Sequence, residues 1–167
     1  NFLYEPWVIK EYNQTEIHYK QNTYEQLYNK CDSVIDLIYK FQELYSSLGK
    51  TFVFCLIPDK AVIYPEYVPE KNNYKPNTIG IPEYYSINLK EKGVNVLDFK
   101  DWYLSIKDTT DILVYPQTGT HWSMITSAYS FDSIIKYAEV LSNRNIVDYS
   151  FSEPYKEEAK GVDVDLE

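Results

Sequence analysis

Apolar side chains between residues 23 and 48 recur at alternating spacings of four and three, which places them on one face of a helix. These positions are Leu27, Cys31, Val34, Ile38, Phe41, Tyr45 and Leu48. Thr23 can cap the start, with Gln26 in the capping-box position, and Gly49 supplies the left-handed residue that often ends a helix. The pattern predicts a helix over residues 23–48. Since a strand pattern follows directly, we expect this helix to pack on a sheet.

Residues 51–57 read TFVFCLI, with apolar side chains on both faces of the predicted strand. Such a strand is typical of a parallel sheet that helices cover on both sides. It ends at Pro58, Asp59 and Lys60, so two charged groups follow its carboxyl end. In open α/β sheets ligands bind at that edge. We therefore expect a functional site there.

The rest of the chain alternates helical and strand patterns. Helices are predicted over residues 82–92 and 123–141, strands over residues 94–99 and 111–115, and a helical turn over residues 101–106. The last helix is expected to turn Ala128, Phe131, Ile134, Ile135, Ala138 and Leu141 inward. This alternation predicts an α/β fold with a mainly parallel sheet, and 167 residues fit a single domain.

Three segments lack a regular pattern. Residues 1–22 mix aromatic and polar side chains and are expected to form an irregular lead-in. Residues 61–78 contain three prolines, which favour a long extended excursion. Residues 144–167 are acidic and weakly periodic, as in a surface loop or tail.

The formal net charge of −9 argues against nucleic acid and against an anionic membrane surface, because both require clustered Lys and Arg. No run of about 18 apolar residues is present, so we expect no membrane insertion within this chain. The chain opens at Asn1 without Met, and we expect export signals to have been removed. Eighteen tyrosines fit either stacking on sugars or a compositional bias that also enriches Asn, Lys and Ile.

The two cysteines are expected to be free core thiols. Cys31 lies in the predicted first helix and Cys55 in the strand that follows it. At the usual rise per residue of helix and strand, the two miss each other axially by roughly 12 Å. Disulfide formation needs Cα atoms within about 7 Å, so we expect no bridge between them.

His121 lies in the string Thr-Gly-Thr-His-Trp-Ser between a predicted strand and the last helix. A loop that leads from a strand to a helix lies at the functional edge of the sheet and suits a catalytic base. Ser123 is a natural N-cap for the helix. The alternative is a surface loop that Trp122 anchors and in which His121 has no chemical role.

Three stretches together resemble the SGNH-hydrolase-like proteins of the alginate O-acetyltransferase type. QTGTHWS, residues 117–123, is similar to their Asp-x-His-Trp signature, whose usual form is Thr-Asp-Thr-His-Trp. LIPDKAVIYPE, residues 56–66, is similar to an apolar strand followed by Pro-x-Lys and Tyr-Pro-Glu. FLYEPW, residues 2–7, resembles the start of the globular domain, which follows a membrane anchor in typical members. The order and spacing of the three agree with the family.

The resemblance implies a three-layer SGNH-type α/β fold with a mainly parallel sheet flanked by helices. It implies an exported, periplasmic or extracellular enzyme that transfers acetyl groups to or from a polysaccharide, without a cofactor or metal. A serine would be the nucleophile, activated by His121 as general base and oriented by an aspartate. We expect the substrate site to include Asp59, Lys60, Tyr64, Trp122 and Ser123. A membrane-bound partner would supply the acetyl group.

The chain departs from the family pattern in two ways. Gly119 occupies the aspartate position, and Asp59 or Asp111 are the candidates to replace that carboxylate. The serine nucleophile of the family lies well after the histidine motif, so we expect it beyond Glu167 and the domain to be incomplete at its C-terminal end. An incomplete sheet predicts self-association or modest stability.

Other functions have weaker support in the sequence. An inactive glycan-binding module is the main alternative, because Gly119 lacks a carboxylate and tyrosines are abundant. Asp59 and Glu66 could form a glycosidase pair, although nothing fixes their separation. With two histidines and no acidic pair at ligand spacing beside either, the sequence does not predict a zinc site. A purely structural envelope scaffold has no positive support.

Overall fold

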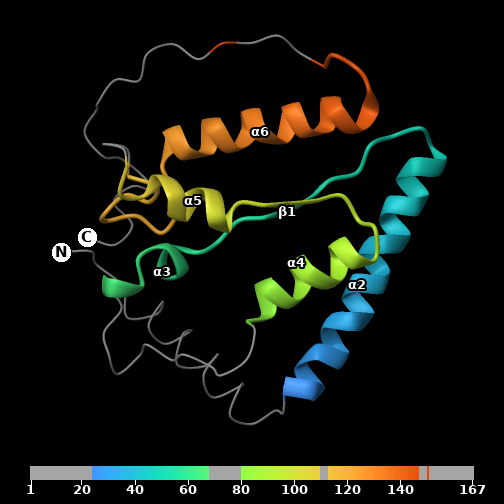
Figure 1. Ribbon diagram of the computed structural model, residues 1–167, viewed down its shortest axis with the longest axis horizontal. Helices are drawn as coiled ribbons and strands as arrows, with labels where there is room; N and C mark the ends of the chain where they lie inside the picture. The colour runs from blue at the N-terminus through green and yellow to red at the C-terminus, as the bar shows by residue number, and fades with distance from the viewer. Residues whose placement is uncertain (1–23, 68–79, 110–112, 147–149, 151–167) are drawn as a thin grey trace.

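The computed structural model describes residues 24–67, 80–109, 113–146 and 150 (Figure 1). The predicted lead-in, most of the predicted excursion and nearly all of the predicted tail lie outside these residues. Among the described residues, no helix is long and apolar enough to cross a membrane. Cys31 is buried, Cys55 is half-buried, and both are free thiols, as predicted.

Helices and two short strands alternate along the described chain. In order they are α2 (Tyr24–Ser47), β1 (Phe54–Leu56), α3 (Lys60–Ile63), the 3-10 helix η1 (Pro65–Tyr67), α4 (Ile81–Glu91), β2 (Val96–Asp98), α5 (Lys100–Ile106) and α6 (Met124–Ser142). The two strands pair in parallel, with Phe54 opposite Val96 and Leu56 opposite Asp98. This arrangement confirms the α/β class.

The sheet separates two core clusters. The first cluster consists of Cys31, Ile35, Ile38, Leu89, Val94 and Val96, against which Phe54 and Leu56 pack. The second cluster consists of Ile63, Tyr64, Phe99, Tyr103, Val114 and Tyr115, against which Cys55, Leu97 and Ile134 pack. Successive strand residues therefore alternate between the clusters, as the pleat of a strand requires. Figure 1 shows α2 and α4 on one side of the strands and α6 on the other.

Helix α2 confirms the prediction for residues 23–48, but its buried face lies slightly away from the predicted one. Leu27, Cys31 and Ile38 are buried as expected, together with Ile35 and Gln42. The predicted positions Val34, Phe41, Tyr45 and Leu48 are 40–62 % exposed. The Gln42 side chain donates to the Gly93 carbonyl (2.9 Å) and accepts from the Asn95 amide (2.8 Å), which draws this face onto the turn after α4. Gly49 ends the helix at φ 66°, as predicted.

Two predictions about local structure were wrong in part. Residues 60–67 form α3 and η1 rather than an extended excursion, because Asp59 caps α3 by accepting the amides of Ala61 and Val62. Residues 113–115 are not a strand, and residues 111–112 lie outside the described residues. The amide of Val114 donates to the Tyr64 hydroxyl and its carbonyl accepts from Ser123, so both groups are bound outside a sheet.

Burial of β1 and α6 also differs from the predictions. The strand predicted over residues 51–57 is confined to β1, and its residues are half-buried rather than buried on both faces. Within the described residues β1 pairs with β2 alone, which leaves its other edge uncovered by a strand. Helix α6 is confirmed, but its buried residues are Thr126 and Ser130, and the predicted inward residue Phe131 is 54 % exposed.

Candidate functional site

The loop that carries His121 is fixed at both ends. We call residues 113–123 the His loop. It begins with Val114 and Tyr115, which are almost completely buried in the second cluster. It ends where the Ser123 amide donates to the Val114 carbonyl (2.9 Å). The Ser123 hydroxyl then accepts the Thr126 amide (3.2 Å) and caps α6. His121 therefore lies two residues before Ser123, the N-cap of α6, whose backbone is itself bound to Val114.

The His loop rests on the segment that follows β1. The Lys60 ammonium donates to the carbonyls of Gln117 and Gly119, each at 2.9 Å. The Val114 amide donates to the Tyr64 hydroxyl (3.3 Å), and the Tyr115 hydroxyl donates to the Pro58 carbonyl. These contacts join the two stretches that resemble the acetyltransferase family. They bring His121 to the carboxyl end of β1, the edge at which ligands bind in α/β sheets.

Burial keeps the two tyrosines of this contact in their neutral form. Desolvation is the main reason that the pKa of Tyr115 is strongly raised, and the negative charge of Asp59 contributes in the same direction. Desolvation also raises the pKa of Tyr64, although the Val114 amide and the Lys107 charge oppose it. A neutral hydroxyl suits both positions. That of Tyr115 donates to the Pro58 carbonyl, and that of Tyr64 accepts from the Val114 amide.

His121 itself is exposed. Its ring lies edge-on to Trp122, with ring centroids 5.3 Å apart and an interplanar angle of 87°. Trp122 is half-buried and packs against the second cluster. The core therefore fixes the position of Trp122, next to the exposed His121 ring. An imidazole in this position can exchange a proton with a hydroxyl that approaches from outside the loop.

The remaining sequence candidates have defined places. Asp59 is exposed, and its Oδ1 accepts the amides of Ala61 (2.9 Å) and Val62 (3.0 Å) as the N-cap of α3. Gly119 is buried under the Lys60 ammonium, and Asp111 lies outside the described residues. Glu66 forms an ion pair with Lys107 (2.9 Å). Because Lys107 directly follows α5, this contact places Glu66 against the end of that helix. Within the described ranges, no three His, Cys, Asp or Glu side chains gather as a metal site.

Several serine hydroxyls in and before α6 are hydrogen-bonded within the structure. Ser130 donates to the Thr126 carbonyl (2.7 Å) and also shares a hydrogen bond with the Tyr103 hydroxyl (2.8 Å). Ser133 donates to the Tyr129 carbonyl (2.9 Å). The Ser123 hydroxyl is the N-cap of α6. These hydroxyls bind neighbouring backbone and side-chain groups, and a nucleophile from another segment remains a prediction.

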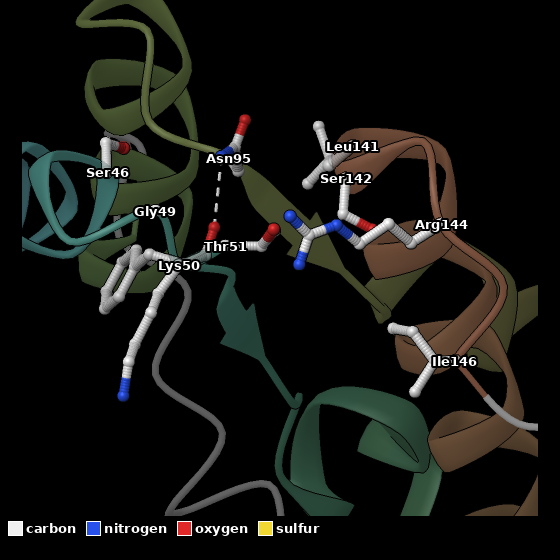
Figure 2. A pocket seen from close by; sticks show the side chains of 10 residues that line it. Ser46, Gly49, Lys50, Thr51, Asn95, Leu141, Ser142, Arg144 and Ile146 are labelled. Atoms are coloured by element: carbon white, nitrogen blue, oxygen red, sulfur yellow. Dashed lines mark hydrogen bonds between the residues drawn. The ribbon is translucent and has the colours of Figure 1, made fainter.

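A hollow of about 620 Å³ lies at the opposite end of the strands (Figure 2). Its lining includes Thr51, Phe52 and Asn95, which precede β1 and β2, and Ser142 and Arg144 at the end of α6. His121 precedes the start of α6 and approaches the segment after β1. The hollow is therefore separate from the His loop, and nothing in its lining supplies a catalytic base.

His121 remains a prediction from the sequence, which did not indicate the structural roles of Lys60 and Tyr115. A charged residue directly after a strand is usually exposed, so Lys60 was expected to face a substrate. Tyr115 was expected to be part of a strand. The available signal was the tyrosine at the end of the apolar run DILVY, since a buried tyrosine needs a partner for its hydroxyl.

Comparison with known proteins agrees with this geometry. A family model described as the SGNH hydrolase-like domain of acetyltransferase AlgX matches residues 16–162, which is most of the chain. Neither the curated proteins nor the solved structures contain a match. The matched region includes both halves of the contact between the His loop and the segment after β1. The chain belongs to the SGNH hydrolase-like family of acetyltransferase AlgX.

Proposed function

We propose that this domain takes part in O-acetyl transfer to, or removal from, a polysaccharide, with His121 as general base. One observation carries the proposal. The loop with the histidine is held at the carboxyl edge of β1 by Lys60, Tyr64 and Tyr115, in a chain that belongs to an acetyltransferase family. Core clusters on both faces of the sheet also support the proposal of a three-layer architecture for this domain.

The proposed reaction proceeds through an acyl-enzyme. His121 removes the proton from a serine hydroxyl, whose oxygen attacks the acetyl carbonyl. The tetrahedral intermediate then collapses, and the departing donor oxygen takes the proton from the imidazolium. In the second half a sugar hydroxyl or water gives its proton to His121 and attacks the acetyl-serine, which restores the serine. We propose that this serine comes from a segment outside the described residues.

The substrate would approach the exposed side of the His loop. Trp122, beside the imidazole, can offer a ring face to a sugar, and exposed Asp59 can accept its hydroxyls. We also propose that the protein is exported and acts at the cell envelope, with a membrane-bound partner as the acetyl donor. These last points are proposals that the resemblance to the acetyltransferase family supports.

A comparison of two histidine variants in the full-length protein tests the role of His121. Release of p-nitrophenol from p-nitrophenyl acetate should fall to background on His121→Ala, because the serine then has no base. His18→Ala removes the other histidine of the chain and should leave the rate unchanged. Equal rates in wild type and His121→Ala would reject the assignment. Mass spectrometry of the acetylated intermediate would identify the nucleophile.

An inactive glycan-binding module is the second candidate function, and Gly119 is the observation that favours it. No carboxylate at that position can orient the imidazole, and in a serine protease the loss of the orienting aspartate costs about 10⁴-fold in rate. Glycan binding by the full-length protein without any acetyl turnover would support this candidate. Restored turnover on Gly119→Asp would show that the fold remains competent for catalysis.

A further inference from the structure

We propose that Lys60 is a positioning residue for His121. Its ammonium fixes the backbone just before the histidine, at the place where the usual family aspartate is missing. This inference rests on the proposed function of His121, but its structural part can be tested without catalysis. Lys60 would act through the carbonyls of Gln117 and Gly119 rather than by contact with a substrate.

The lysine is held at both ends of its side chain. Its backbone opens α3, whose first turn is capped by Asp59 and whose residues Ala61 and Ile63 are buried. Its side chain runs inward, since the whole residue is only 5 % exposed. At its tip the ammonium bridges the carbonyls of Gln117 and Gly119 at 2.9 Å each. A rigid element therefore fixes the position of the charge that holds the loop.

Burial of the ammonium makes this contact specific. An ammonium that leaves water must replace its hydration with good acceptors, and two carbonyl oxygens at short distance do so. If the His loop moved away, the charge would be left buried without these acceptors. The loop position that satisfies Lys60 is thus favoured over its alternatives, and His121 is only two residues beyond the second carbonyl.

Glycine at position 119 makes this restraint more important. Glycine can adopt more backbone conformations than any other residue. Gly119 therefore restricts the backbone ahead of His121 less than another residue would. Lys60 binds the carbonyl of that same glycine. An aspartate would contact the ring and select its tautomer as well, whereas Lys60 restrains only the backbone. With no carboxylate at position 119, the lysine thus restrains the backbone ahead of His121.

Lys107 provides a matched control. Its ammonium also donates to a backbone carbonyl, that of Ile63 (2.7 Å), and pairs with Glu66. It also lies over the Tyr64 ring, 5.1 Å from the centroid. Lys107 therefore packs in the same region and carries the same charge. Its ammonium binds the segment after β1, whereas that of Lys60 binds the two carbonyls of the His loop.

The test follows the His121 ring by NMR in Lys60→Met and Lys107→Met. Trp122 is edge-on to His121, so a fixed loop gives the imidazole protons a ring-current shift that loop motion averages away. His18 is the one other histidine and serves as internal reference. We expect Lys60→Met to move the His121 signals towards random-coil values and Lys107→Met to leave them in place. In the full-length enzyme Lys60→Met should lower kcat by at least about tenfold with little change in KM.

Unchanged His121 signals in Lys60→Met would overturn the proposal, whatever the activity. Equal changes in both variants would also overturn it, because the lysine would then act only through general stability. If Lys60→Met does not fold, Lys60→Arg decides, since the longer side chain keeps the charge but presents its donors in a fixed planar fork, which changes the geometry of both contacts. Altered His121 signals in that variant support the proposal, and unchanged signals reject it. Should His121→Ala remain active, the proposed function fails while the NMR result on Lys60 still stands.

Discussion

At the scale of single residues, Tyr115 is a buried side chain whose one polar atom has a specific partner. Its hydroxyl donates to the Pro58 carbonyl and its ring meets Tyr103 edge-on, with centroids 6.5 Å apart. Tyr115→Phe would keep the ring and leave a buried carbonyl without its donor. We expect a loss of about 1–3 kcal/mol in the free energy of unfolding, measured by urea denaturation.

Tyr45→Phe is the control for this prediction. Tyr45 is 40 % exposed and stacks on Phe52 through its ring, which phenylalanine preserves. Removal of that hydroxyl should change the free energy of unfolding by less than about 0.5 kcal/mol. Because burial raises the pKa of Tyr115, the difference between the two variants should be the same at pH 6 and pH 8. Equal losses would mean that the Tyr115 hydroxyl is not a structural donor.

At the scale of elements, the start of α4 depends on an ionised carboxylate. Glu83 binds the Lys100 ammonium (2.6 Å) and accepts the Gly80 amide (3.3 Å). The Lys100 hydrogen bond is the main reason that the pKa of Glu83 lies below its ordinary value of 4.5. Since the pKa is lower in the folded state, the ionised group stabilises the fold above about pH 4.5. This contribution is lost as the pH falls through the folded pKa.

Glu83→Gln should therefore lower the free energy of unfolding by about 0.5–1 kcal/mol at pH 7, as for other exposed pairs. The side chain is 46 % exposed, which keeps the effect small. Thermal unfolding of variant and wild type should converge at pH values well below 4.5, where Glu83 is protonated. Glu43→Gln, at an exposed position of α2, is the control at pH 7 and should change the free energy of unfolding by less than about 0.5 kcal/mol. If the difference in stability between Glu83→Gln and wild type stays constant down to acid pH, the ion pair with Lys100 is not its cause.

Elements were predicted well wherever local spacing and end signals agreed. The helical period of the apolar side chains and the end signal of Gly49 were enough to predict α2, and the helix predicted over residues 82–92 is confirmed as α4. Short segments defined by side-chain contacts were missed. Helix α3 depends on the Asp59 cap, and residues 113–115 leave the strand conformation because Tyr64 and Ser123 bind the backbone of Val114. The contact between Tyr64 and Val114 joins residues 50 positions apart, so no short window along the chain contains both partners.

At the scale of the whole molecule, only the second of the two core clusters includes residues of the His loop. The His loop begins inside the second cluster, which also contains Ile63 and Tyr64 of the segment after β1. The first cluster joins α2, α4 and β2 on the other face of the sheet. A packing defect in either cluster should therefore lower the free energy of unfolding by a similar amount. Only a defect in the second cluster should change the position of His121.

Leu89 and Ile63 allow this difference to be measured, because both are fully buried and have side chains of the same size. Either change to alanine should cost about 2–5 kcal/mol through lost contacts and a residual cavity. Leu89→Ala opens its cavity in the first cluster, so the NMR signals of His121 should stay in place. Ile63→Ala opens its cavity beside Tyr64, beneath the His loop, and should shift those signals while the variant is still folded. If both variants shift the His121 signals equally, a packing defect on one face of the sheet is transmitted to the other. The position of His121 then depends on both clusters.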